Sequence, residues 1–336
     1  MTHETDPDIS VVMSVYNGAE LIRESVDCIL SQEEVNLELV VIDDGSTDGT
    51  GAILDDFALK DRRIRVVHQE NTGLTRALIR GCREARGKYI ARHDCGDISF
   101  PRRLAELKEA LDTDPNLSFV SSWTEFCGPE QEFLYLSKGS GQAEAPVNII
   151  SGSVSRLIID GPSCHPSVMF RKHCYDKAGG YRPEFYFGQD WDLWYRLAEV
   201  GQFRMIRSVL YRARVMPGSI SAAGRAEQKE LGKLSREGLR LRLAGLSDEP
   251  VLQAAAKIRP LPRNSLSKDS RKIEWLYFIG EILRQNGDRR ARCYFGEALR
   301  ENFFHARAWF RLIQTLFVKV PDPKTRQKSL QKHHKF

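Results

Sequence analysis

Two groups of acidic residues occur where strands are predicted to end. Segment 43–48 (DDGSTD) follows an apolar run at 37–42, and segment 92–97 (RHDCGD) follows another at 89–91. In an open parallel sheet, ligands bind beyond the carboxyl ends of the strands. Paired carboxylates there would repel a phosphate unless they hold a hard cation or bond a base or ribose. The pattern indicates a metal-assisted nucleotide site, although the same residue types also form turns and helix caps.

The apolar pattern alternates between strand and helix along the first hundred residues. β-Branched residues predict a buried strand at 9–16, and helical spacing follows at 21–30. The same alternation then gives a strand at 37–42, a helix near 53–57, a strand at 64–67, a helix at 74–85 and a strand at 89–91. Such βαβ units predict an α/β fold with a mostly parallel sheet covered by helices on both faces.

Beyond residue 100 the pattern is less regular. A short strand is expected at 118–121, a loop in the Gly-, Ser- and Pro-rich segment 138–146, and a helix at 225–243. The segment 250–270 reads as a linker because it holds Pro260 and Pro262. We therefore expect three parts, namely a nucleotide-binding domain (1–222), an all-helical module (223–318) and a disordered basic tail (319–336).

The helical module carries a possible repeat. Trp275, Ala291, Phe295 and Ala298 have the spacing of a tetratricopeptide repeat, and Trp309 follows Trp275 by 34 positions. A single generic helical hairpin explains the pattern equally well, because fewer than about three repeats rarely stand alone.

Composition and charge narrow the class of protein. With 336 residues, 28% of them charged, and a mean hydropathy of −0.40, the chain resembles an ordinary globular protein of about two domains. It has no apolar run long enough to span a bilayer and no signal-peptide pattern, so we expect it in the cytoplasm. Residues 319–336 carry six basic side chains and one acidic one, which accounts for the whole formal charge of +5. This distribution argues against a nucleic-acid partner and predicts peripheral contact with the inner face of the membrane.

Two other nucleotide-binding classes do not fit the motifs. A dinucleotide site would need G-x-G-x-x-G after the strand that ends at Ile42, whereas the chain has Gly45, Gly49 and Gly51 at different spacing. The triphosphate motif G-x-x-x-x-G-K-[ST] does not occur either.

Six segments, in order between Ile9 and about Met216, together resemble the inverting family 2 glycosyltransferases, which have a GT-A type fold. They are SVVMSVYN (10–17), VIDDGSTD (41–48), ENTG (70–73), GKYIAR (87–92), HPSVMFR (165–171) and GQDWDLW (188–194). The resemblance implies a hexosyltransferase that moves a sugar from a nucleotide sugar, usually a UDP-sugar, to an acceptor hydroxyl. The acceptor would belong to a cell-surface glycan or its lipid-linked precursor, which places the enzyme in polysaccharide biosynthesis.

The resemblance also assigns roles by motif position. Asp190 matches the catalytic base, and Mn²⁺ or Mg²⁺ would be held by Asp94 and Asp97, with help from His165. The residues that would bind the nucleotide sugar are Val15, Asn17, Asp43, Asp44, Gly73 and Asp94.

The sequence departs from the family pattern at two places. Gly96 stands where D-x-D-D members carry an acid, which puts metal binding in doubt, and Gln189 replaces the Glu that commonly precedes the base. Structural explanations also exist for single residues: His165 could simply bond beside a proline turn, and Asp190 could stabilise a helix start. For the whole chain, the alternative is an inactive transferase-like scaffold that binds partners through its helices.

Overall fold

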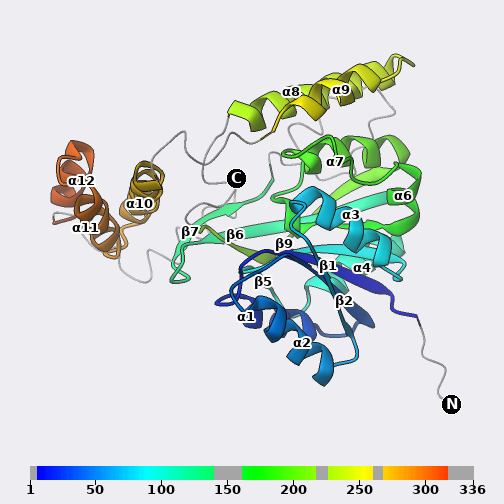
Figure 1. Ribbon diagram of the computed structural model, residues 1–336, viewed down its shortest axis with the longest axis horizontal. Helices are drawn as coiled ribbons and strands as arrows, with labels where there is room; N and C mark the ends of the chain where they lie inside the picture. The colour runs from blue at the N-terminus through cyan, green and yellow to red at the C-terminus, as the bar shows by residue number, and fades with distance from the viewer. Residues whose placement is uncertain (1–5, 140–160, 217–225, 260–267, 317–336) are drawn as a thin grey trace. The chain divides into compact units, whose positions relative to one another are not determined.

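The computed structural model describes residues 6–139, 161–216, 226–259 and 268–316 (Figure 1). The chain divides into two compact units. The first comprises 1–125, 136–213 and 224–260, and the second comprises 126–135, 214–223 and 261–336. Residues 140–146 of the loop predicted at 138–146, and the basic tail at 319–336, lie outside the described residues.

Nine strands form one sheet within the described ranges. They are β1 (Ile9–Val15), β2 (Leu37–Asp44), β3 (Ile64–Gln69), β4 (Tyr89–Asp94), β5 (Ile98–Ser99), β6 (Leu117–Cys127), β7 (Phe133–Ser137), β8 (Met169–Arg171) and β9 (Gln202–Arg214). The strand order is β3-β2-β1-β4-β8-β6-β9-β5, and β7 pairs with β6. The four predicted strands, β1 to β4, pair in parallel as expected, whereas β8 pairs antiparallel with both β4 and β6.

The described part of the first unit has eight helices, most of which pack on one or the other face of this sheet. They are α1 (Ile22–Leu30), α2 (Thr50–Lys60), α3 (Leu74–Glu84), α4 (Arg103–Thr113), α6 (Lys172–Lys177), α7 (Gln189–Val200), α8 (Ala226–Leu243) and α9 (Glu249–Lys257), with a 3-10 turn η2 (His165–Ser167) before β8.

Alternate residues of β1 point into two separate cores. Val11 and Met13 pack with α1, α2 and α4 on one face, while Val12 packs with α3 and α7 on the other. Figure 1 shows α1 and α2 on the opposite side of the strands from α3 and α7. The sheet is therefore buried on both faces, which is why its strands read as continuous apolar runs.

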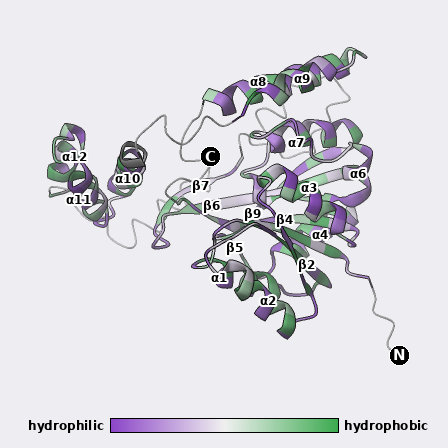
Figure 2. Cartoon of the chain, in the orientation of Figure 1, coloured by the Kyte–Doolittle hydropathy of each residue, from purple (hydrophilic) through white to green (hydrophobic). Residues whose placement is uncertain are grey.

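Helices α8 and α9 belong to the first unit, although the sequence analysis grouped this range with the helical module. Val251 and Ala255 of α9 pack with Leu231 of α8 and with Phe185 and Phe187 before α7. The expectation of a linker over 250–270 was therefore wrong for its first part, because α9 buries one apolar face there. Figure 2 shows hydrophobic and hydrophilic residues side by side along α8 and α9.

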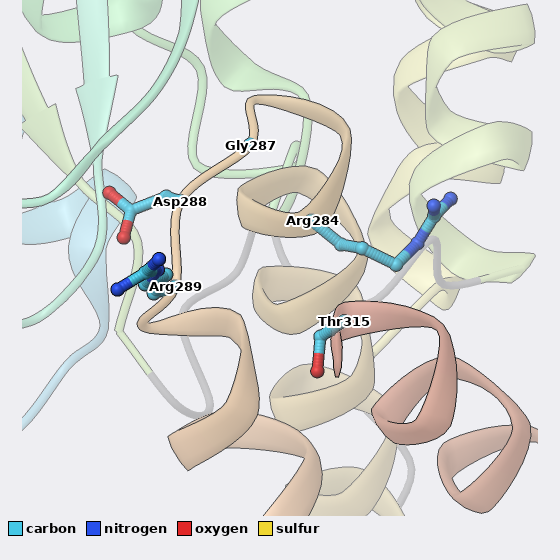
Figure 3. A pocket seen from close by; sticks show the side chains of 5 residues that line it. All are labelled: Arg284, Gly287, Asp288, Arg289 and Thr315. Atoms are coloured by element: carbon cyan, nitrogen blue, oxygen red, sulfur yellow. The ribbon is translucent and has the colours of Figure 1, made fainter. Parts of the chain in front are cut away.

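The second unit has three further helices in its described part: α10 (Lys268–Gln285), α11 (Ala291–Glu301) and α12 (Ala306–Leu316). Trp275, Phe295 and Ala298, which suggested the repeat, are all buried in its core. A small pocket of about 10 Å³ is lined by Arg284, Gly287, Asp288, Arg289 and Thr315 (Figure 3). It has room for about one water molecule and cannot hold a nucleotide sugar. None of the described helices is long and apolar enough to cross a membrane.

Candidate active site

The register of the parallel strands brings both acidic groups to one edge of the sheet. Val15, the last residue of β1, lies opposite Asp43 of β2, and Ser14 lies opposite Asp94 of β4. The loops that follow β1, β2 and β4 therefore start side by side, as the sequence analysis expected of a ligand site at the carboxyl ends of the strands.

Asn17 joins the loops after β1 and β2 through hydrogen bonds. The backbone N–H of Asn17 donates to Ser46 Oγ over 2.9 Å, and its Oδ1 accepts from the N–H of Thr47 over 2.8 Å. Gly18 N–H donates to Thr50 Oγ1 over 2.9 Å. Asn17 adopts a φ of 54°, in the left-handed region that asparagine tolerates better than most residues. Asn17 thus shapes the predicted donor site through backbone geometry.

The two aspartates at the end of β2 have different partners. Asp43 Oδ2 lies 2.8 Å from Nδ1 of His68, whose Nε2 lies 3.0 Å from Asp55 Oδ1. Hydrogen bonds to Asp55 and then to Asp43 raise the pKa of His68. Asp43 is 5% exposed, and through His68 it connects β2 with β3 and α2.

Asp44 is engaged by the loop before α3. Its Oδ1 accepts from Gln69 Nε2 (2.7 Å) and Thr72 N–H (2.9 Å), and its Oδ2 accepts from Gly73 N–H (2.9 Å). The residue is 2% exposed. Asp44 therefore holds the loop at 69–73 in place, and its predicted contact with a uracil or ribose stays a prediction.

Gly73 occupies a position where a side chain would be too close to a neighbouring ring. It has a φ of 86°, and a Cβ there would lie 3.2 Å from the ring of Tyr186. The glycine lets Tyr186, shortly before α7, lie against the loop that Asp44 organises. This close approach links the nucleotide-side segment 70–73 to the segment that carries Asp190.

Arg92 of β4 is a fully buried guanidinium beneath this edge of the sheet. It donates to Asp94 Oδ1 and to the carbonyl oxygens of Val12 (3.2 Å) and His93 (3.0 Å). Its exposure is 0%, whereas the side chain of Asp94 is 40% exposed. A buried charge needs such partners to offset its loss of hydration. Arg92 therefore fixes Asp94 at the surface with one of its two oxygens in use.

Asp97 is held by a tyrosine that is distant in the sequence. Tyr211 of β9, itself buried, donates its hydroxyl to Asp97 Oδ2 over 2.8 Å and accepts from the N–H of Asp94 over 3.2 Å. Between the two acids, Gly96 has a φ of 95°, and a Cβ there would meet Leu21 Cδ1 at 3.0 Å. The turn thus favours glycine at the position where related motifs carry an acid.

His165 and His93 both lie among protein partners. His165 Nε2 bonds the Tyr181 hydroxyl over 2.7 Å, and its ring packs edge-on against Trp194. Burial, and then the charge of Arg92, lower the pKa of His165 well below its usual value. His93 is fully buried, with Nδ1 3.2 Å from Ser99 Oγ.

Asp190 lies in the first turn of α7, which starts after Gly188. The helix has no side-chain cap, and Asp190 Oδ1 accepts a hydrogen bond from the N–H of Trp191 over 2.9 Å. Burial raises the pKa of Asp190, the Trp191 N–H and the charge of Arg92 oppose the shift, and Asp94 adds to it. Asp190 lies on α7 and Asp94 on β4, and the charges of Asp94 and Arg92 both act on the pKa of Asp190.

The neighbours of Asp190 have structural roles. Asp192 is 1% exposed and forms a salt bridge of 2.5 Å with Arg196 one turn later in the same helix. Phe185 and Trp194 are buried at 0% and 3% exposure, so they belong to the core. Trp191 is partly buried and packs edge-on against Trp194.

The residues predicted to hold a metal do not form one cluster. No group of three His, Cys, Asp or Glu that could hold a metal occurs in the part of the chain that the structure describes. Asp97 is 7% exposed and bonded to Tyr211, and His165 is bonded to Tyr181. The set Asp94, Asp97 and His165 therefore does not fit a metal site built by the protein alone.

The sequence analysis missed Arg92 and Tyr211. Arg92 had a usable signal, because residues two apart on a strand share a face, and Arg92 precedes Asp94 by two. Tyr211 had none, because its partner Asp97 is 114 positions away in the chain.

A family comparison agrees with this geometry. The family model described as Glycosyl transferase family 2 matches residues 10–179, about half of the chain. The chain therefore belongs to glycosyltransferase family 2 and is a glycosyltransferase by class, as the six segments predicted.

Individual relatives agree with this assignment, and solved structures match the fold. The chain is 33% identical over 214 residues to the protein EpsE of Bacillus subtilis, covering 62% of this chain and 73% of EpsE. It is 28% identical over 225 residues to chondroitin synthase of Escherichia coli, covering 67% of this chain and 31% of that protein. Residues 1–349 of S. aureus TarS in complex with UDP-GlcNAc match with a TM-score of 0.56 at 15% identity, over 97% of this chain and 92% of that chain.

A mannosyltransferase of Pyrobaculum calidifontis in complex with GDP-Man and Mn²⁺ matches with a TM-score of 0.52 at 19% identity, over 94% of this chain and 86% of that chain. At these identities the structural matches concern the fold. They confirm the predicted GT-A type fold with helices after residue 226.

Proposed function

We propose that the chain transfers a sugar from a nucleotide sugar to an acceptor hydroxyl with inversion, and that Asp190 is the general base. One observation carries this proposal. Asp190 of α7 lies close enough to Arg92 and Asp94 of β4 for both charges to act on it, since Arg92 lowers the pKa of Asp190 and Asp94 raises it. A single in-line displacement needs a base near the acceptor oxygen and charge neutralisation near the departing diphosphate.

The environment of Asp190 suits proton removal. An acceptor hydroxyl is a poor nucleophile, and a base works best when its pKa approaches the working pH. Burial raises the pKa of Asp190 in that direction, while the hydrogen bond from Trp191 N–H and the charge of Arg92 oppose the rise. With its Oδ1 bonded to Trp191 N–H, the carboxylate has Oδ2 to accept the acceptor's proton.

We assign the donor to the edge formed by β1, β2 and β4. Val15 and Asn17 lie at this edge, and Asp44 holds the loop that contains Gly73 beside it. The family resemblance favours a UDP-sugar. Because the matched structures bind UDP, UDP-GlcNAc or GDP-Man, any panel of donors tested should include sugars linked to UDP and to GDP.

We propose a narrower role for a divalent cation than the sequence suggested. Mg²⁺ and related ions often use one or two carboxylates together with substrate phosphates. Asp94, 40% exposed with only Oδ1 on Arg92, fits that role, so a cation would bind with the donor's diphosphate. When bound, it would offset charge on the leaving diphosphate.

The acceptor is assigned by the resemblance alone, as a hydroxyl of a cell-surface glycan or its lipid-linked precursor. The alternative of an inactive scaffold is not favoured, because the chain belongs to a transferase family and keeps Asp94 and Asp190 in one site.

The test is a donor-hydrolysis screen with the full chain over UDP- and GDP-sugars, with and without Mn²⁺. We expect one donor to be hydrolysed by the wild type and not by Asp190→Asn, with nucleotide affinity unchanged. Failure to bind or hydrolyse any donor would favour the scaffold.

A further inference from the structure

The segment that leads into α7 is bonded to the start of α3. Residues 185–187 come shortly before α7, which begins after Gly188. Thr75, in the first turn of α3, donates its hydroxyl to the carbonyl oxygen of Phe185 over 2.9 Å. Thr75 and Phe185 are 4% and 0% exposed, so this hydrogen bond is shielded from water. It joins the segment before Asp190 to the helix that follows the loop at 69–73.

The ring of Tyr186 makes a second contact between the same two parts of the chain. A Cβ on Gly73 would lie 3.2 Å from Cε2 of Tyr186 and 3.5 Å from its hydroxyl oxygen, so the ring lies against the backbone of Gly73. The N–H of Gly73 donates to Asp44 Oδ2 over 2.9 Å. Tyr186 therefore contacts the same residue through which Asp44 holds the loop.

The segment 185–187 is also held from its other side. Phe185 and Phe187 are 0% and 3% exposed. Their rings pack with residues of α8 and α9, namely Leu231, Val251 and Ala255. Helix α8 packs against both α7 and α9, and Figure 1 shows the three helices next to one another. The segment is therefore fixed between α3 with its preceding loop and the pair α8 and α9.

Asp190 follows this fixed segment closely. It stands three positions after Phe187. Gly188, between them, has a φ of 67°, and no side chain caps the start of α7. The position of the first turn of α7 therefore depends on its packing and on the segment before it. A continuous set of contacts runs from Asp44 through Gly73 and Tyr186 to the turn that carries Asp190.

We propose that Tyr186 and Thr75 are positioning residues, which keep Asp190 at a fixed distance from the bound nucleotide sugar. This inference rests on the proposed function, in which the donor lies beside the loop at 69–73 and Asp190 is the base. A misplacement of about 1 Å between reacting groups can lower a rate by on the order of 10²-fold. A rigid link between the donor loop and the first turn of α7 therefore matters for the reaction.

The same link has a consequence for nucleotide binding. A ligand that binds one arrangement of a loop opposes the local openings that disrupt that arrangement. Thr75 and Tyr186 join segment 185–187 to the loop and to α3. A nucleotide bound beside the loop should therefore slow amide hydrogen exchange in residues 185–192 as well as in residues 69–73. This measurement requires neither turnover nor knowledge of the acceptor.

Two independent variants remove the link. Tyr186→Leu removes the ring, whereas Tyr186→Phe keeps it and serves as the conservative variant. Thr75→Val removes the hydroxyl with little change in shape. The second unit offers a matched control for each variant. Tyr277→Leu changes another partly buried tyrosine, and Thr315→Val changes another threonine that is 4% exposed and donates to a backbone carbonyl.

The test combines hydrogen exchange with and without UDP or GDP, nucleotide affinity by calorimetry, and the rate of donor hydrolysis at saturating donor, all with the full chain. In the wild type, Tyr186→Phe and the two controls, the nucleotide should slow exchange in both 69–73 and 185–192. In Tyr186→Leu and Thr75→Val, the protection of 185–192 should be lost. Their hydrolysis rate should fall about 10- to 100-fold, with nucleotide affinity changed by less than about threefold. Melting temperatures show whether each variant folds.

The inference would be overturned by a wild type in which the nucleotide protects 69–73 and leaves 185–192 unchanged. Wild-type hydrolysis and protection in Tyr186→Leu or in Thr75→Val would remove that residue from the role, and an equal loss of rate in the controls would assign the effect to stability. These results leave the proposed function in place. A failure of the proposed function differs, because then neither nucleotide protects 69–73 or Asp190→Asn hydrolyses the donor at the wild-type rate, and the inference fails with it.

Discussion

Arg92 and Asp94 form an ion pair in which the cation is fully buried and the carboxylate is 40% exposed. Because Arg92 also bonds two backbone carbonyls, the pair attaches a surface carboxylate rigidly to strand β4. The same guanidinium acts on Asp190, so one buried charge influences both carboxylates of the candidate site.

We predict that Arg92→Lys lowers the transfer rate more than it lowers stability. Lysine keeps the charge but cannot reproduce the fork that reaches Asp94 and two carbonyls. In Arg92→Met the loss of positive charge should raise the pKa of Asp190 further, because Arg92 now lowers it. The acid side of the pH–rate profile should therefore move to higher pH in Arg92→Met, and a profile unchanged in position would contradict this role. Arg102→Lys, at an arginine 49% exposed that pairs with Glu34, itself 64% exposed, serves as control for a surface pair.

Removing the charge of Asp190 should not destabilise the fold. A carboxyl whose pKa is raised in the folded state binds its proton more tightly there, so its ionised form reduces stability at pH values above that pKa. Asp190→Asn should therefore be as stable as the wild type or more stable at pH 7, with the difference vanishing as the pH falls below the pKa. Urea unfolding at several pH values measures this, and a variant less stable at pH 7 than at low pH relative to wild type would contradict it.

Tyr211→Phe should loosen the acidic turn. The variant removes a hydroxyl that donates to a carboxylate and accepts from a backbone N–H, at a cost of about 1.5–3 kcal/mol in the free energy of unfolding. Affinity for the nucleotide diphosphate should fall as well, because Asp94 loses one support. Calorimetry and urea unfolding check both, and Tyr135→Phe in the second unit is the control. Unchanged values in both assays would mean that Tyr211 only fills space.

Any stimulation of nucleotide binding by Mn²⁺ should depend on Asp94 more than on Asp97. Asp94→Asn removes the exposed carboxylate, so calorimetry with and without chelator should give the same affinity for that variant. Asp97→Asn can still accept from Tyr211 and should keep most of the response. If the effect of Mn²⁺ on affinity depended more on Asp97, then Asp97, one of the two aspartates that the sequence analysis assigned to the cation, would be its main ligand.

The parts of the fold predicted from sequence are those set by local pattern. Strands β1 to β4 are long apolar runs separated by amphipathic helices, and their parallel pairing follows from the crossovers. The location of Asp43, Asp44 and Asp94 at strand ends followed directly. Asp190 came from a motif, and local pattern alone would have assigned it to the start of a helix.

The missed features depend on contacts between distant residues. The antiparallel pairing of β8 with β4 and β6 joins segments far apart in the sequence, and so does the bond of Tyr211 to Asp97. Helix α9 was taken for part of a linker because Pro260 and Pro262 follow it, and its own Pro250 lies in the first turn, where proline is tolerated. The partners that occupy Asp44 could not be predicted either, since they are mostly backbone N–H groups.

The central claim is tested most directly by the transfer rate of Asp190→Asn. Asp192→Asn is a poor control, because it would break the buried salt bridge with Arg196, so Asp176→Asn, at a residue 58% exposed, is used instead. Loss of a general base should lower the rate by about 10²- to 10⁴-fold, with melting temperature and nucleotide affinity kept and the control at wild-type rate. A rate for Asp190→Asn above about a tenth of wild type would contradict the assignment of Asp190 as the base.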